Sequence, residues 1–224
     1  MTRVHDMGGR FGDGAITPEA DGIPQLGDWQ ARALALTLAA GALGQWNIDV
    51  SRHARERLSP ADYGRFSYFE KWIAALADLL VETGVLTEED LRGDGAAGAH
   101  PLAERAMKAE AVAAVLARGG PADRPSNVAP RFEVGQAVRT LRPAANRLVD
   151  GGHTRLPAYA AGARGRIVLK HGSHVLPDSN AHRLGEAPEP LYAVAFPASE
   201  LWADPEAPRD EVVLDLWQSY LEPA

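Results

Sequence analysis

The 224-residue chain is 46% hydrophobic and 24% charged, which is typical of a globular protein with substantial loops. Its formal net charge of -7 argues against nucleic-acid binding, because the basic footprint that binds a phosphate backbone is missing. No apolar run reaches the roughly 18 residues of a membrane span, and the first residues lack the apolar core of a signal peptide. We therefore expect a cytoplasmic protein with no membrane partner. The absence of cysteine excludes disulfides and thiolate metal ligands from this chain.

Residues 1–26 are rich in Gly, Asp and Pro and show neither helical nor strand periodicity. This composition predicts an extended arm. Its scattered apolar side chains would pack on this protein or on a partner. A frayed terminus would fit the same residues equally well.

Residues 27–118 predict a helical domain. Asp28 can cap a helix that runs to about Trp46, and Asn47 and Asp49 are expected to end it. The segment 51–57 then carries four potential cations just before the next helix. Such a run is most often a solvated surface.

Three further helical segments are expected in the same domain. Ser59 followed by Pro60 is a strong helix start, and a helical stripe of large apolar residues continues to Gly84. Thr87 can start a short helical turn, and residues 101–118 predict an alanine-rich helix. Few of the apolar side chains in this last helix are large, so we expect the domain to pack on a partner.

Residues 119–131 are rich in Gly and Pro and predict a linker. Beyond it the periodicity changes, and residues 132–224 predict a domain of short strands separated by turns. Several short strands with long loops favour a small, partly open antiparallel barrel, so the fold class is α+β. The expected strands are 132–139, 166–169, 191–196 and 212–216.

Candidate metal ligands occur in one region. His171 and His174 are the closest histidine pair, with Asp178, His182 and Glu186 further along the chain. A zinc site needs three or four ligands with fixed support, and a pair beside a turn is more often polar surface. We therefore predict no metal site in this chain.

Neither general acid catalysis nor a nucleophile is well supported. Paired carboxylates occur only in polar stretches, and Ser51 near His53 has no accompanying oxyanion motif. Arginine is a better candidate, because its fork of donors stays charged and can hold an oxyanion in bidentate fashion. Arg52, beside a group of aromatic residues, and Arg155, in a rigid loop, are the two candidates, although on the residues alone ordinary surface arginines explain both better.

The chain resembles the beta subunit of nitrile hydratase along its whole length. The resemblance rests on motifs that occur in the family's order: MTRVHDMGGRFGDG, SYFEKW, LLVETGVLTEEDL, FEVGQAVR, HTRLPAYAAGARGRIV, PDSNAHRLGEAPEPLYAVAFPASELW and VVLDLWQSYLE. It implies an amino-terminal arm that wraps a partner, a helical half and a carboxy-terminal SH3-like antiparallel β-barrel. The arm, helices, linker and barrel expected from the residues agree with it.

The resemblance also implies the chemistry. In this family a separate alpha subunit holds non-corrin cobalt(III) or non-heme iron(III) in a cysteine cluster with two oxidised sulfurs, and the enzyme hydrates nitriles to amides. By motif position, Arg52 and Arg155 would hydrogen-bond the oxidised cysteine oxygens. Ile48, Ser51, Tyr68 and Trp72 match positions that line the nitrile channel. Ser51 replaces an aromatic residue often found there, and Trp72 resembles the cobalt-type members.

Two other functions stay open at this point. A related assembly that hydrolyses thiocyanate shares these motifs, but it is typically split over two shorter chains. A non-catalytic activator or metallochaperone resembles only the helical half, whereas this chain has both halves. The preferred nitrile, the metal, the choice between heterodimer and heterotetramer, and the activity of this particular copy are not determined by the residues.

Overall fold

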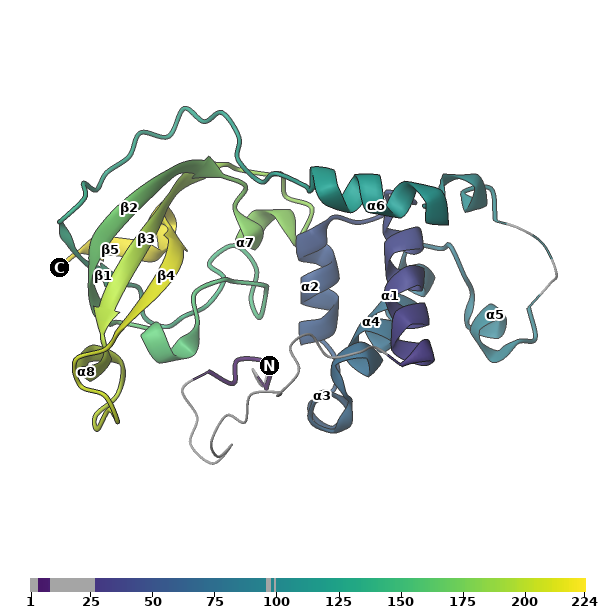
Figure 1. The fold of residues 1–224 in the computed structure, drawn as a ribbon, viewed down its shortest axis with the longest axis horizontal. Helices are drawn as coiled ribbons and strands as arrows, with labels where there is room; N and C mark the ends of the chain where they lie inside the picture. The colour runs from purple at the N-terminus through teal and green to yellow at the C-terminus, as the bar shows by residue number, and fades with distance from the viewer. Residues whose placement is uncertain (1–3, 9–26, 96–97, 99) are drawn as a thin grey trace. The chain divides into compact units, whose positions relative to one another are not determined.

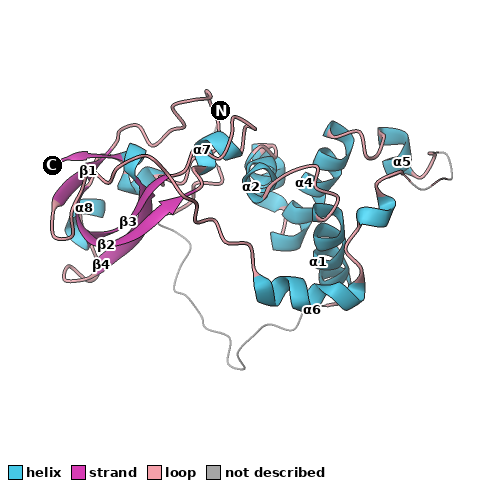
Figure 2. Ribbon diagram, turned by 90° about the horizontal axis from the view of Figure 1, so that it is seen from above, coloured by secondary structure: helices cyan, strands magenta, loops and turns pink. Residues whose placement is uncertain are grey.

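The computed structural model describes residues 4–8, 27–95, 98 and 100–224, and most of the predicted arm therefore lies outside the described residues. The contacts divide the described residues into two compact units, one with residues 4–5 and 27–120 and the other with residues 6–8 and 121–224. We call residues 27–120 the helical unit and residues 121–224 the strand-rich unit. Figures 1 and 2 show helices α1 to α6 in the first unit and all the labelled strands in the second.

The helical unit contains short helices joined by turns. In chain order they are α1 (Asp28–Gly41), α2 (Ile48–Glu56), α3 (Pro60–Arg65), α4 (Tyr68–Glu82), α5 (Glu88–Arg92), a 3-10 turn (Ala103–Arg105) and α6 (Ala109–Arg118).

Helix α2 corrects the sequence prediction. Asn47 and Asp49 were expected to end the first helix, but α1 already ends at Gly41 and Asn47 caps the start of α2. The Asn47 side-chain oxygen accepts hydrogen bonds from the N–H groups of Asp49 (3.0 Å) and Val50 (2.9 Å). An asparagine can end one helix or begin another, and the backbone conformation of the residues on either side decides which of the two occurs. The cation-rich segment therefore belongs to helix α2 and is not a connection before the next helix.

The other helix starts agree better with the prediction. Ser59 caps α3 with Pro60 in its first turn, and Thr87 forms a capping box with Asp90 at α5. A second capping box at Ser67 starts α4, so the continuous stripe expected after Ser59 is split between two helices. Helix α6 begins later than predicted, and none of its residues is buried.

The core of the helical unit is small. Ala54 of α2 and Ala75 and Leu79 of α4 are buried against each other, with Trp46 and Val50 packed beside them. Small residues allow α2 and α4 to approach closely, which fixes the face of α2 that remains outside.

The strand-rich unit is built on an antiparallel sheet. Its elements are β1 (Ala137–Thr140), a 3-10 turn (Ala158–Ala160), β2 (Arg164–His174), α7 (Pro177–Asn180), β3 (Glu189–Pro197), α8 (Ala198–Leu201), β4 (Glu211–Trp217), a 3-10 turn (Gln218–Tyr220) and β5 (Leu221–Pro223).

The strand order is β4-β3-β2-β1-β5, with β4 and β5 at the edges. Every neighbouring pair is antiparallel, as in the registers Ile167 with Val194 and Val194 with Leu214. The α+β class and the four expected strands are confirmed, although the first strand starts later than expected. The sheet is open and not closed, so the SH3-like barrel is not confirmed. The three-residue β5 was missed because it is too short to show a period.

Strand β3 lies at the centre of the core, with seven consecutive residues buried. A strand covered on both faces reads as a continuous apolar run, and this is why its sequence was easy to recognise. The side chains packed around it come from most elements of the unit. The buried members are Phe132, Val138, Ala144, Leu156, Ala160, Ala163, Ile167, Leu176, Tyr192, Val194, Phe196, Leu216, Tyr220 and Leu221.

Residues 121–131 run along the strand-rich unit. Arg124 donates from Nε and Nη2 to the two carboxylate oxygens of Glu186, both at 2.8 Å, and Ser126 donates to the Pro188 carbonyl. The Arg131 N–H donates to Gln218 Oε1 at 2.7 Å. Within the described part of the chain, no helix has the length and apolar character needed to cross a bilayer.

Candidate functional site

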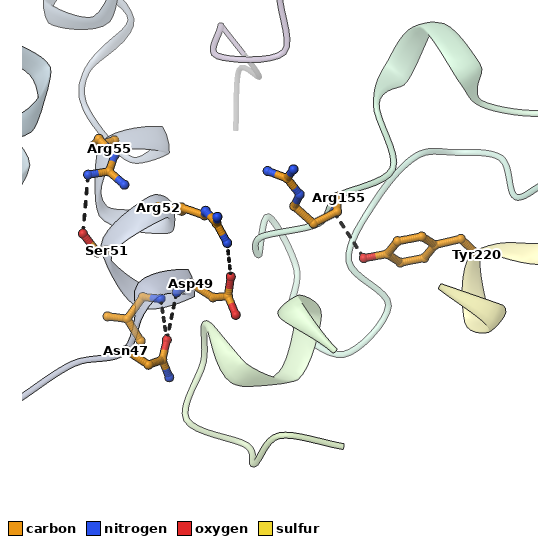
Figure 3. Close-up of polar contacts among 8 residues, drawn as sticks. Asn47, Asp49, Ser51, Arg52, Arg55, Arg155 and Tyr220 are labelled. Atoms are coloured by element: carbon orange, nitrogen blue, oxygen red, sulfur yellow. Dashed lines mark hydrogen bonds and ion pairs between the residues drawn. The ribbon is translucent and has the colours of Figure 1, made fainter. Parts of the chain in front are cut away.

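Arg52 lies on α2 and is held by a buried acid. Its Nη1 donates to Asp49 Oδ1 at 2.9 Å, and Asp49 is 4% exposed whereas the Arg52 side chain is 39% exposed. The spacing of three residues on a helix places both side chains on the same face. Figure 3 shows the pair beside the Asn47 cap. The guanidinium is thus held through Nη1, and part of the side chain remains open to solvent.

A second group of side chains connects α2 with α4. The Arg55 guanidinium lies 4.8 Å from the Trp72 ring centre, and its Nη1 donates to Ser51 Oγ at 3.4 Å. Trp72 in turn contacts Tyr68, with ring centres 5.4 Å apart. The structure therefore brings together Ser51, Tyr68 and Trp72 of the predicted channel residues. Arg55 links them, and in the sequence it is only one of the four potential cations of residues 51–57.

Arg55 is partly buried. Burial lowers the pKa of its guanidinium, and the neighbouring charge of Arg52 acts in the same direction. The stacking on Trp72 compensates part of that cost, because an aromatic face attracts a cation. Ile48, the fourth predicted channel residue, is 62% exposed at the start of α2, and Tyr68 is 64% exposed. Apolar surface of this kind is suited to contact with an apolar ligand or partner.

Arg155 lies in a loop of the strand-rich unit, between buried His153 and buried Leu156, while Arg155 itself is exposed. Its backbone N–H donates to Tyr220 Oη at 3.2 Å (Figure 3). The Tyr220 hydroxyl donates in turn to Asp178 Oδ1. The backbone at Arg155 is therefore anchored to the interior although its side chain points outward.

Two more buried or partly buried side chains anchor the same loop. Asn146 Nδ2 donates to the carbonyl of His153 (2.6 Å) and to that of Asp178 (2.9 Å). Its Oδ1 accepts from the N–H groups of residues 148 and 149, so all four hydrogen-bonding positions of the amide are used. The His153 N–H donates to His182 Nε2 at 3.0 Å.

Asp178 is an unusual acid. Burial raises the pKa of its carboxyl to about 6. The hydrogen bonds from the Tyr220 and Thr154 hydroxyls and the charge of His153 lower this pKa, but their effect is smaller than that of burial. Burial and the adjacent carboxylate raise the pKa of Tyr220 well above its usual value, so the phenol stays protonated and keeps donating. Both side chains line a mostly apolar cavity of about 80 Å³ together with Leu156 and Leu176.

The candidate metal ligands of the sequence between residues 171 and 186 each take part in specific contacts. His171 Nε2 lies 2.8 Å from Asp215 Oδ1, and Glu186 pairs with Arg124. His182 accepts from the His153 N–H, and Asp178 accepts from Tyr220. These four candidate ligands therefore have four different partners, and the rings of His171 and His174 lie 6.5 Å apart.

The fold and these residues define an α+β protein that presents arginine and aromatic side chains from a helical unit and a strand-rich unit. Residues 1–115 match the family model described as nitrile hydratase beta subunit, N-terminal, and residues 121–223 match the C-terminal model of the same subunit. The chain belongs to the nitrile hydratase beta-subunit family.

Relatives match from end to end. The low-molecular weight cobalt-containing nitrile hydratase subunit beta of Rhodococcus rhodochrous is 34% identical over 230 residues, which cover 100% of both chains. The nitrile hydratase subunit beta of Pseudomonas putida is 36% identical over 225 residues, again with 100% of both chains covered. The cobalt-containing nitrile hydratase subunit beta of Pseudonocardia thermophila is 33% identical over 99% of this chain and 96% of its own.

A partial likeness to a solved structure was also found. Thiocyanate hydrolase from Thiobacillus thioparus, as the recombinant apo-enzyme, is 26% identical over 43% of this chain and 78% of its own, with a TM-score of 0.38.

Proposed function

We propose that this chain is the beta subunit of a nitrile hydratase, which adds water across a nitrile to give the amide. The observation that carries the proposal is the match to beta subunits of that enzyme over the whole chain, at 34% and 36% identity. The active protein would be a complex with a separate alpha subunit, as a heterodimer or heterotetramer, in the cytoplasm.

Arg52 and Arg155 are proposed to donate hydrogen bonds to the oxidised cysteine oxygens of the alpha subunit. Such oxygens are anions that need charge-assisted partners when they are buried at an interface. The Asp49 carboxylate restrains the Arg52 guanidinium, and the Tyr220 hydroxyl restrains the backbone of Arg155. A donor that is already restrained loses less entropy when it binds its anion.

The substrate would contact Ile48, Ser51, Tyr68 and Trp72. The contacts through Arg55 support a common surface for Ser51, Tyr68 and Trp72. A serine beside two aromatic rings leaves more room than an aromatic residue would, which favours bulkier nitriles.

The metal is proposed to be held by the alpha subunit. This chain contains no cysteine, and its candidate ligands His171 and Glu186 are paired with Asp215 and Arg124. The exposed arginines of this chain suit a role as donors toward a metal centre that the partner holds. Cobalt(III) is favoured over iron(III), because two of the relatives described above are named as cobalt-containing. The metal would polarise the nitrile or activate water.

We also propose that the sheet is of the SH3-like barrel class. Five antiparallel strands with β5 beside β1 and the sequential order β1 to β4 support this assignment.

The arginine roles can be tested in the assembled complex. The chain and its alpha subunit are co-expressed, and Arg52→Ala and Arg155→Ala are each expected to lower the rate of amide formation by about 100-fold or more, the usual effect of losing one charge-stabilising donor. Subunit stoichiometry and metal content should stay as in the unmodified complex. Thiocyanate consumption is measured in the same preparations, because thiocyanate hydrolysis is the alternative activity.

Matched controls remove one exposed arginine from each unit. Arg92→Ala in the helical unit and Arg209→Ala in the strand-rich unit are expected to leave turnover near its original value, since both side chains are exposed and lie outside the proposed site. Turnover that stays near normal in both Arg52→Ala and Arg155→Ala would contradict the arginine assignment. Thiocyanate consumption without amide formation would contradict the proposed reaction.

A further inference from the structure

We propose that Tyr220, Asp178 and Asn146 form a positioning network that fixes the backbone of residues 153–155 and thereby sets the location of the Arg155 guanidinium. The inference rests on the role proposed above for Arg155. In this proposal the three residues contact neither the nitrile nor the oxidised cysteine oxygens, and they act through the loop of residues 153–155.

The first argument is the number and placement of the anchors. The carbonyl of His153 accepts from Asn146, and the N–H of Arg155 donates to Tyr220. The backbone is therefore held two residues before Arg155 and at Arg155 itself, the residue whose side chain is exposed. Exposed loops usually leave such backbone groups to water and are mobile for that reason. Here the anchors restrict the loop while the arginine remains accessible.

The second argument is the orientation of the phenol. A tyrosine hydroxyl has one hydrogen to donate and lone pairs with which to accept. The Tyr220 O–H donates to Asp178, and this turns a lone pair of the oxygen toward the Arg155 N–H. Asp178 is held in turn by Asn146, which donates to the Asp178 carbonyl. The Asp178 carboxylate therefore determines the direction from which the Tyr220 oxygen accepts the hydrogen bond of the Arg155 N–H.

The third argument is that stability alone does not explain Asp178. The carboxyl is 5% exposed at the wall of a mostly apolar cavity, and burial raises its pKa to about 6. The groups around the carboxyl are Tyr220, His153, Thr154 and Glu189. An ionised carboxylate at this place is costly, and an apolar side chain would fill the cavity better. A fixed hydrogen-bond direction is what the acid provides and an apolar side chain does not.

The test compares two buried tyrosines of the same unit. Tyr220→Phe removes the acceptor of the Arg155 N–H and keeps the ring. Tyr192→Phe removes an equally buried hydroxyl that donates to Gln218 at 2.9 Å, outside the network. Both variants are prepared in the complex with the alpha subunit. Hydrogen exchange at the Arg155 amide and steady-state nitrile hydration are then measured.

In Tyr220→Phe, exchange at the Arg155 amide is expected to rise on the order of tenfold, because its hydrogen bond is lost. The kcat is expected to fall about 10- to 100-fold with KM nearly unchanged, because the displaced guanidinium acts in the chemical step. Tyr192→Phe should change neither quantity by more than a small factor. Asp178→Asn, which keeps an oxygen to accept from Tyr220, should retain most of the protection at Arg155.

The outcomes separate this inference from the proposed function. If Tyr220→Phe exchanges at Arg155 as slowly as Tyr192→Phe, the positioning network is refuted. If exchange rises and Arg155→Ala is inactive but Tyr220→Phe keeps its full kcat, the link to catalysis is refuted. If exchange rises while Arg155→Ala itself is fully active, the network holds the loop as inferred and the function proposed for Arg155 is wrong. Should Tyr220→Phe not assemble, Asp178→Ala removes the hydrogen bond from the Tyr220 hydroxyl to Asp178, which orients that hydroxyl, and is expected to give the same two changes.

Discussion

Replacing Asp178 with asparagine would measure the cost of burying its carboxyl. The pKa of this group is raised from 3.8 to about 6, so the folded state holds the proton more tightly than the unfolded state. The stabilising contribution is therefore complete below about pH 4 and is lost as the pH rises through about 6. A shift of about two units corresponds to roughly 3 kcal/mol once the loss is complete.

Asparagine has no such titration. Between about pH 4.5 and pH 7.5, the wild-type chain should lose roughly 2 kcal/mol of unfolding free energy relative to the Asp178→Asn variant. The absolute cost of the substitution cancels, because only the change of the difference with pH is used.

The assay is urea unfolding of the full chain at several pH values. Unfolding is detected by hydrogen exchange in peptides from β3. These peptides report the strand-rich unit separately from the helical unit. Asp150→Asn, which removes an exposed carboxyl near the same loop, corrects for the loss of one charge. Parallel pH curves for wild type and Asp178→Asn would refute the reasoning, since they would mean that burial does not raise the pKa of this acid.

Two further substitutions test the fold. Asn47→Ala removes the cap of α2 and should cost about 1 kcal/mol, seen as faster hydrogen exchange in the first turn of that helix, whereas Asn47→Asp should keep most of the protection. Unchanged exchange in Asn47→Ala would contradict the capping role. Tyr192→Phe removes one of the two donors to Gln218 Oε1, which keeps the Arg131 N–H, and should lower the unfolding free energy by about 1 kcal/mol in urea titrations, an effect that a midpoint equal to wild type would disprove.

Much of the fold could be predicted because its signals are local. Ser59 with Pro60 and Thr87 with Asp90 carry their capping partners within four residues, and both helix starts are confirmed. Strand β3 is a continuous apolar run because it is buried on both faces. Where a signal had two local meanings, as at Asn47, the prediction was wrong.

The candidate site was only partly predictable. The resemblance placed Arg52 and Arg155, and helical spacing alone connects Arg52 with Asp49. Arg55 was not singled out, although it lies four residues after Ser51 and so on the same helix face. Its contact with Trp72 joins two helices, and no local pattern predicts such a contact.

The sequence by itself determined the class of the fold, the absence of cysteine ligands and the family, because composition, periodicity and ordered motifs are properties of the chain alone. The tertiary structure decided how Arg155 is supported. Asn146, Asp178 and Tyr220 are separated by more than thirty residues from one another, and they meet only because the sheet and its loops fold around a common core. The raised pKa of Asp178 has the same origin, since burial is a property of the packed chain and not of any segment.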